Sequence, residues 1–243
     1  MEWYKSWFNS EEYLKVYRHR DNKDAEALIE LFLNNIDTDR VKNLLDMACG
    51  AGRHAVILAQ KGFTVTAVDL SDNLLSVAKS SAADSGVNID FIQSDIRDFK
   101  TDKKFDLILN LFTSIGYFEQ DEENYFILKK AYDLLAGGGF FVLDYFNKEY
   151  VEANLEPQTV DEFDNTRIVQ NRFISGERVI KEITIDSNGK TNKFVESVRM
   201  FSYDELIGAL KKIGFKIKNV FGDFKGSKFK LESSPRIIII ASK

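Results

Sequence analysis

The sequence predicts an α/β fold, in which a mostly parallel seven-stranded sheet has helices on both faces and a small antiparallel sheet is inserted late in the chain. From Asn43 to Asp144, short apolar runs alternate with longer helical patterns, which is typical of βαβ units. A glycine-rich turn, Gly50-Ala51-Gly52, follows the first of these runs. Turn residues then separate three strand patterns between Thr166 and Met200.

The strands of the main sheet are identified by short runs rich in β-branched, leucine and aromatic residues. We expect them at residues 43–48, 64–68, 90–92, 105–110, 139–144, 215–221 and 236–241. Two sets of apolar residues recur at helical spacing and predict helices that cover the sheet: Leu74, Leu75, Ala78 and Ala82, and Ile127, Ala131, Leu134 and Leu135. Ser202 and Glu205 predict a capping box for a later helix that ends at Gly214.

These patterns divide the chain into four parts. Residues 1–42 form an aromatic-rich N-terminal helical cap, expected to pack over the carboxyl edge of the sheet. Residues 43–159 form the Rossmann-like core, and residues 201–243 complete it. Residues 160–200 form the inserted antiparallel sheet, whose hairpin turns are expected at Ser175-Gly176 and Ser187-Asn188-Gly189. The insertion leaves the core near its carboxyl edge, where it can act as a lid or a dimer surface.

Composition narrows the class of protein. The net charge of -5 argues against a protein that binds nucleic acid by bulk attraction to phosphates. No apolar run approaches the roughly 20 residues that a membrane-spanning helix needs. A single cysteine cannot form an internal disulfide, and the N-terminus lacks a signal-peptide pattern, so we expect a cytoplasmic location without a membrane partner. The state expected in solution is a monomer or a homodimer.

The glycine-rich turn points to a nucleoside ligand. Gly50, Gly52 and Ala55 satisfy the G-x-G-x-x-G/A pattern between a strand and a helix. Asp69 ends the next strand about 20 residues later, where a carboxylate can accept hydrogen bonds from ribose hydroxyls. Asp46, just before the turn, would repel the pyrophosphate of NAD or FAD. A phosphate-free cationic nucleoside reverses that sign, which favours S-adenosylmethionine over a dinucleotide.

The same residues resemble the class I S-adenosylmethionine-dependent methyltransferases. Residues 46–52 are similar to their first motif, residues 67–71 to their acidic second motif, and residues 93–96 to the segment that meets the adenine. Residues 134–139 resemble their L-x-P-G-G turn, from which Ala136 and Gly137 depart. The resemblance implies the Rossmann-like methyltransferase fold, S-adenosyl-L-methionine as methyl donor and S-adenosyl-L-homocysteine as product. The inserted sheet and aromatic N-terminus resemble a small-molecule branch that includes sugar-amine N-methyltransferases.

Candidate cofactor contacts follow from the motifs and from the N-terminal tyrosine and basic residue that the resemblance implies: Tyr17, Arg20, Asp46, Ala48, Gly50, Gly52, Asp69, Leu70, Asp95, Ile96, Asn110 and Leu111. Asp69 and Asp95 also fit plain loop or cap carboxylates. Candidates for accepting a proton from the methyl acceptor are His19, His54, Tyr117 and Asp144. Tyr117 and Asp144 equally fit packing roles, and Cys49 fits a structural thiol. No metal site is expected.

The function that these observations indicate is transfer of a methyl group to a nitrogen or oxygen of a small molecule by in-line displacement. That reaction needs alignment and desolvation more than a catalytic triad. Two alternatives stay open: an RNA methyltransferase, because lysines gather between residues 211 and 230, and a protein that binds the cofactor without catalysis.

Overall fold

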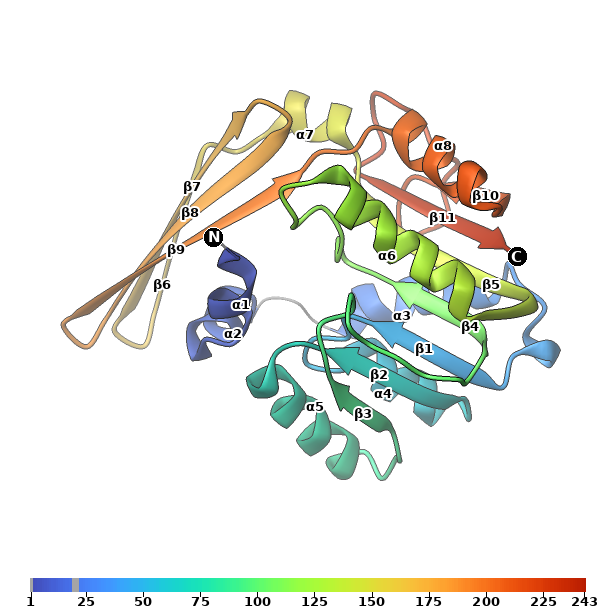
Figure 1. Ribbon diagram of the computed structural model, residues 1–243. Helices are drawn as coiled ribbons and strands as arrows, with labels where there is room; N and C mark the ends of the chain where they lie inside the picture. The colour runs from blue at the N-terminus through green and yellow to red at the C-terminus, as the bar shows by residue number, and fades with distance from the viewer. Residues whose placement is uncertain (1, 19–21) are drawn as a thin grey trace.

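The computed structural model describes residues 2–18 and 22–243, and its main sheet has seven strands in the order β10-β11-β5-β4-β1-β2-β3. Strand β11 runs antiparallel to both of its neighbours, and the other pairs are parallel. The predicted mostly parallel sheet is therefore confirmed (Figure 1). The strands are β1 (Asn43–Met47), β2 (Thr64–Asp69), β3 (Asp90–Gln93), β4 (Phe105–Asn110), β5 (Leu135–Phe146), β10 (Lys216–Phe221) and β11 (Arg236–Ser242).

Helices cover both faces of this sheet, as predicted. On one face lie α3 (Asn22–Leu33), α4 (Arg53–Gln60) and α5 (Asp72–Asp84), and their side chains Phe32, Leu58 and Leu75 share one buried cluster. On the other face lie α6 (Asp121–Leu134) and α8 (Tyr203–Ile213), which contribute Leu128 and Leu210 to a second cluster. The remaining helices are α1 (Trp3–Phe8), α2 (Glu11–Val16), the short η1 (Thr38–Arg40) and α7 (Lys148–Asn154).

The inserted sheet has four strands, one more than the sequence suggested. They are β6 (Gln158–Phe163), β7 (Thr166–Ser175), β8 (Arg178–Ser187) and β9 (Lys190–Arg199), paired antiparallel in chain order. The two hairpins at Gly176 and Asn188-Gly189 were predicted. Strand β6 was not, because it is a polar edge strand and its hairpin turns at Asp164-Asn165 without a glycine. Both of those residues adopt positive φ angles of 42° and 59°.

The first helices divide between the two sheets. The apolar face of α3 is buried on the main sheet. Helices α1 and α2 lie instead beside the inserted sheet (Figure 1), where Trp7 and Val16 are buried against Ile168, Ile183 and Ile185. The expected four-part division of the chain stays a prediction; within its first part, α1 and α2 pack on the inserted sheet and α3 packs on the main sheet. Over residues 2–18 and 22–243, no helix is both long and apolar enough to cross a membrane.

Candidate functional site

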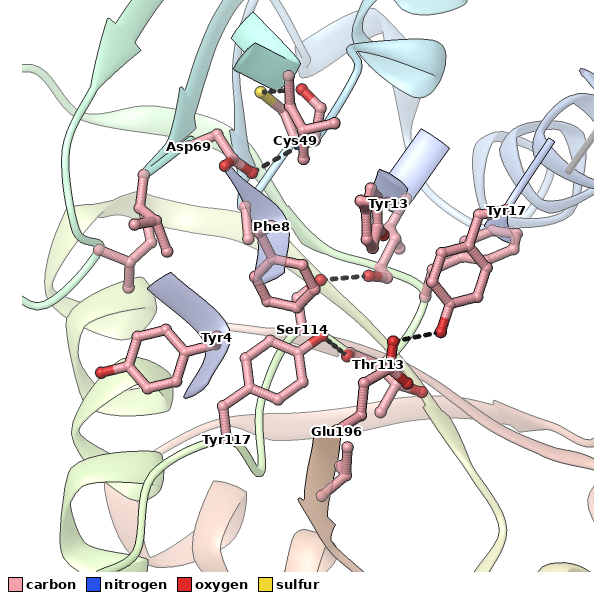
Figure 2. Close-up of a pocket in the computed structure, with 18 of the residues that line it drawn as sticks. Tyr4, Phe8, Tyr13, Tyr17, Cys49, Asp69, Thr113, Ser114, Tyr117 and Glu196 are labelled. Carbon is pink, nitrogen blue, oxygen red and sulfur yellow. Dashed lines mark hydrogen bonds between the residues drawn. The ribbon is translucent and has the colours of Figure 1, made fainter. Parts of the chain in front are cut away.

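A cavity of about 540 Å³ lies at the carboxyl edge of the main sheet. One wall comes from the ends of the parallel strands and includes Asp46, Asp69 and Leu111. The opposite wall comes from the inserted sheet and includes Glu196, and α1 and α2 contribute a set of aromatic side chains (Figure 2). Ligands of open α/β sheets bind at this edge, outside the carboxyl ends of the strands. The position agrees with the one that the sequence motifs indicated.

The glycine-rich turn brings backbone to the cavity. Ala48, Gly50 and Gly52 have φ angles of 61°, 56° and 76°, a region in which an ordinary side chain is strained. A Cβ atom on Gly52 would lie 2.7 Å from Cβ of Ala78, so glycine is needed there for α4 to approach α5. Ala48 and Gly50 line the cavity, whereas Gly52 lies outside its lining. The role of Gly52 is therefore to allow close packing of α4 against α5.

Asp69 is fixed by backbone donors. Its Oδ2 accepts a hydrogen bond from the Gly50 amide at 2.7 Å, and its Oδ1 accepts one from the Ser71 amide at 2.9 Å. Burial raises its pKa, although these amide bonds oppose the shift. A carboxylate oxygen has more than one acceptor position, so Asp69 can still accept hydrogen bonds from ribose hydroxyls.

Asp46 is a buried carboxylate with an unsatisfied oxygen. It is 2% exposed, and its Oδ2 has no hydrogen-bond partner. Burial and the charge of Asp69 raise the pKa of Asp46 to about 7. A cation in the cavity would stabilise the ionised form of this carboxylate, whereas a pyrophosphate would add repulsion. The residues present therefore fit S-adenosylmethionine better than a dinucleotide.

Asp95 lines the cavity in an ion pair that the sequence did not indicate. Its carboxylate accepts hydrogen bonds from the Arg97 side chain at 2.7 and 3.1 Å. Burial opposes ionisation of Asp95, but the bonds from Arg97 hold its pKa below the usual range. The same guanidinium contacts Tyr4 Oη and Glu2 Oε1, each at 2.9 Å. Arg97 thus joins the N-terminal segment to the loop after β3, a long-range contact with no local sequence signal.

Tyr17 lines the cavity but contacts the inserted sheet. Its hydroxyl donates to Glu196 Oε1 at 2.5 Å (Figure 2) and accepts a hydrogen bond from Lys181. Glu196 also accepts from the Trp7 indole at 2.6 Å and pairs with Lys181 at 2.6 Å. This network holds α1 and α2 against the inserted sheet. Sequence reasoning missed Lys181 and Glu196, because only strand pairing brings them to Tyr17.

Of the other predicted cofactor residues, Leu70, Ile96 and Leu111 line the cavity. Asn110 lies outside its lining, although it is buried and its Oδ1 has no hydrogen-bond partner. Arg20, like the proton-acceptor candidate His19, lies outside the described residues.

The described proton-acceptor candidates differ in access to the cavity. His54 is a buried lining residue whose ring lies 5.1 Å from that of Phe112. Tyr117 also lines the cavity, and its hydroxyl donates to the Thr113 carbonyl at 2.5 Å. Burial raises the pKa of the Cys49 thiol well above its usual value, so this side chain stays protonated.

The structure gives Asp144 a different role from the predicted one. Asp144 is fully buried and does not line the cavity. Its Oδ1 pairs with Arg236 at 2.8 Å and its Oδ2 accepts a hydrogen bond from the Phe112 amide at 2.9 Å. Phe112 and Thr113 have positive φ angles of 53° and 61°. Asp144 therefore supports a strained loop whose residues line the cavity, rather than taking a proton from a ligand.

Among residues 2–18 and 22–243, no group of three or more histidine, cysteine, aspartate or glutamate side chains is arranged to hold a metal ion.

Comparison with known proteins agrees with this geometry. Residues 44–139 match the methyltransferase domain family. A provisionally named methyltransferase of Geobacillus sp. (strain WCH70) is 31% identical over 119 residues, covering 49% of this chain and 48% of that protein. The dTDP-3-amino-3,4,6-trideoxy-alpha-D-glucopyranose N,N-dimethyltransferase of Streptomyces venezuelae is 29% identical over 107 residues, 44% of each chain. The matched region thus spans about half the length of these relatives.

The whole fold has a counterpart among solved structures. An S-adenosylmethionine-dependent methyltransferase from Clostridium acetobutylicum superimposes with a TM-score of 0.81 at 22% identity, covering 95% of this chain and 96% of that one. The inserted sheet and the N-terminal helices therefore belong to the shared fold along with the core. Residues 44–139 are thus similar to the methyltransferase domain family, and the chain as a whole has the fold of this S-adenosylmethionine-dependent methyltransferase.

Proposed function

We propose that this protein transfers a methyl group from S-adenosylmethionine to a nitrogen or oxygen of a small molecule by in-line displacement. The observation that carries the proposal is one continuous cavity with two different walls. The strand-end wall has the buried, unsatisfied Asp46 beside Asp69, which suits a cationic nucleoside. The inserted-sheet wall would contact the methyl acceptor next to it.

The residues that would hold the cofactor follow from their positions. Asp69 would accept the ribose hydroxyls, and Asp95 with Ile96 would contact the adenine, as the family resemblance implies. Asp46 would balance the positive charge, with the backbone of Ala48 and Gly50 close by. When bound, the cofactor supplies a methyl group on a positively charged sulfur.

Aromatic side chains of the N-terminal segment lie around this space and would exclude water from it when the ligands are bound. The ring of Tyr117 lies 5.4 Å from that of Trp3 and 5.3 Å from that of Phe8, and the rings of Tyr4 and Phe118 meet edge to face at 5.5 Å. Figure 2 shows Tyr4, Phe8 and Tyr117 close together at the cavity. Desolvation and alignment are the main requirements of an in-line methyl transfer. His54 and Tyr117 remain the described candidates for taking a proton when the acceptor must lose one.

A small acceptor is favoured over RNA for two reasons. The cavity is covered by α1, α2 and the inserted sheet, and the chain carries a net charge of -5. The Streptomyces venezuelae relative is named as a methyltransferase of an amino sugar, which supports a nitrogen acceptor. A cytoplasmic location and a monomeric or homodimeric state belong to the same proposal.

The test is incubation of the full chain with methyl-labelled S-adenosylmethionine, a metabolite extract and total RNA, followed by mass spectrometry of both fractions. We expect label in a small molecule. Label confined to RNA would favour the RNA methyltransferase. Absence of label in either fraction, together with intact cofactor binding, would favour a protein that binds the cofactor without catalysis. Asp69→Ala serves as a control with weakened donor binding.

A further inference from the structure

We propose that the methyl acceptor carries an anionic group, a carboxylate or a phosphate, which binds to Arg172 on the inserted sheet. This inference rests on the proposed function, because it assigns a substrate class to the acceptor half of the same cavity. Arg172 lines the cavity from β7, on the wall opposite the strand ends.

The charges of this wall do not balance. Arg172 on β7 lies directly opposite Lys181 on β8, and Lys181 lies directly opposite Glu196 on β9. Like charges directly opposite each other on neighbouring strands destabilise a sheet. Glu196 pairs with Lys181 at 2.6 Å, which leaves the row with one excess positive charge at Arg172. An anion bound beside Arg172 would neutralise it.

Arg172 is held in place by neutral partners. Its Nη1 donates to Thr159 Oγ1 and its Nη2 to Gln170 Oε1, each at 3.1 Å. In the part of the chain that the structure describes, no carboxylate lies within ion-pair distance of this guanidinium. Arginine has five N–H donors, so three remain for a ligand. A guanidinium fixed before binding loses little freedom when it pairs with a carboxylate or a phosphate.

Two other cationic groups at the cavity, Arg236 and Lys181, have carboxylate partners. Arg236 pairs with the buried Asp144 at 2.8 Å, and Lys181 is paired as described above. The strand-end wall carries the opposite sign, with Asp46 and Asp69. A positively charged donor on one wall and a negatively charged acceptor group on the other would orient both ligands in the cavity.

The other side chains that line the cavity indicate the chemical character of the rest of the acceptor molecule. Apolar side chains line the cavity from α7, from the residue that follows it and from the inserted sheet: Val151, Leu155, Val179 and Val198. An apolar body would bury itself against these residues while the anionic group reaches the guanidinium. The acceptor class is therefore an amine or alcohol with an apolar body and a carboxylate or phosphate at a distance from the methylated atom.

The test uses matched acceptors. Each set shares one amine or hydroxyl and one apolar body, and its members differ in carrying a carboxylate, a phosphate or a neutral amide. Equilibrium dialysis on the protein loaded with S-adenosylhomocysteine measures binding, and methyl-labelled S-adenosylmethionine measures turnover. The variants are Arg172→Met, Arg172→Lys and, as a control, Arg167→Met, an exposed arginine on the same strand that pairs with Glu162.

We expect the anionic members to bind about tenfold to a hundredfold more tightly than the amide, as charged hydrogen bonds allow. Arg172→Met should abolish this preference, Arg172→Lys should retain part of it, and Arg167→Met should leave it unchanged. Cofactor affinity should be the same in all four proteins. The ratio of carboxylate to phosphate binding identifies the group.

Two outcomes would overturn the inference: equal or absent binding of the anionic and neutral members, or an unchanged preference in a folded Arg172→Met protein. Failure of the proposed function is distinguishable, because it would appear as anion-selective binding through Arg172 without methylation of any bound compound.

Discussion

Asp46 and Asp69 lie on neighbouring parallel strands with their carboxylates buried at one wall of the cavity, and the charge of Asp69 helps to raise the pKa of Asp46 to about 7. Two buried carboxylates side by side are unfavourable unless a cation joins them. This arrangement suits the proposed cofactor, since S-adenosylmethionine brings a sulfonium and an ammonium without a phosphate. From it we also expect cofactor binding to depend on pH.

We predict that affinity for S-adenosylhomocysteine falls as the pH decreases from 7 to 5. The pKa of Asp46 is raised in the free protein, so this carboxyl is largely protonated below pH 7. The ammonium of the ligand favours the ionised form, and binding in that range must therefore release a proton. The affinity should drop by up to about tenfold per pH unit, the limit for one proton.

Calorimetric titration in buffers of different ionisation enthalpy measures both the affinity and the released proton. Asp46→Asn is the control, because it cannot ionise and should bind weakly at every pH. The interpretation fails if wild type and Asp46→Asn have the same pH profile.

We predict that Asp69→Ala weakens cofactor binding by about 1.5 to 3 kcal/mol, the range for losing charged hydrogen bonds. The substitution also removes the acceptor for the Gly50 amide, so the turn itself should loosen. Asp84→Ala, at the end of α5, is the matched control. Titration calorimetry gives the affinities and thermal unfolding reports the fold. Equal losses in the two variants would mean that the effect is global.

We predict that Arg97→Met releases the N-terminal segment. Arg97 connects Asp95 at the cavity with Glu2 and Tyr4, so its loss removes the contacts that hold α1 beside the loop after β3. Hydrogen exchange in residues 3–8 should accelerate, and cofactor affinity should fall severalfold. Lys103→Met removes an exposed pair with Asp90 and should change neither. Unchanged exchange in Arg97→Met would show that aromatic packing alone fixes α1.

The parts of the fold that depend on local pattern were predictable. Strand runs such as Thr64–Asp69, the glycine-rich turn and the capping box of Ser202 and Glu205 are encoded in neighbouring residues. The boundaries of helices and strands were less predictable: Leu135 starts β5 instead of ending a helix. Strand β6 was missed because its alternating residues are half-buried or exposed and carry little hydrophobic signal.

Contacts between distant segments were not predictable. From the sequence, Asp144 was a candidate proton acceptor. Its partner Arg236 is 92 residues away in the chain and is placed beside it by the pairing of β11 with β5. The network of Tyr17, Lys181 and Glu196 likewise depends on the register of the inserted sheet and on the docking of α2. Local motifs therefore predicted residues of the strand-end wall, whereas the residues of the inserted-sheet wall could be identified only from the three-dimensional structure.

The most direct test of the account is isothermal titration of the full chain with S-adenosylmethionine, S-adenosylhomocysteine and NAD. The acidic strand-end wall of Asp46 and Asp69 predicts binding of both methionine nucleosides and no measurable binding of NAD. Tighter binding of NAD than of either methionine nucleoside would contradict the account.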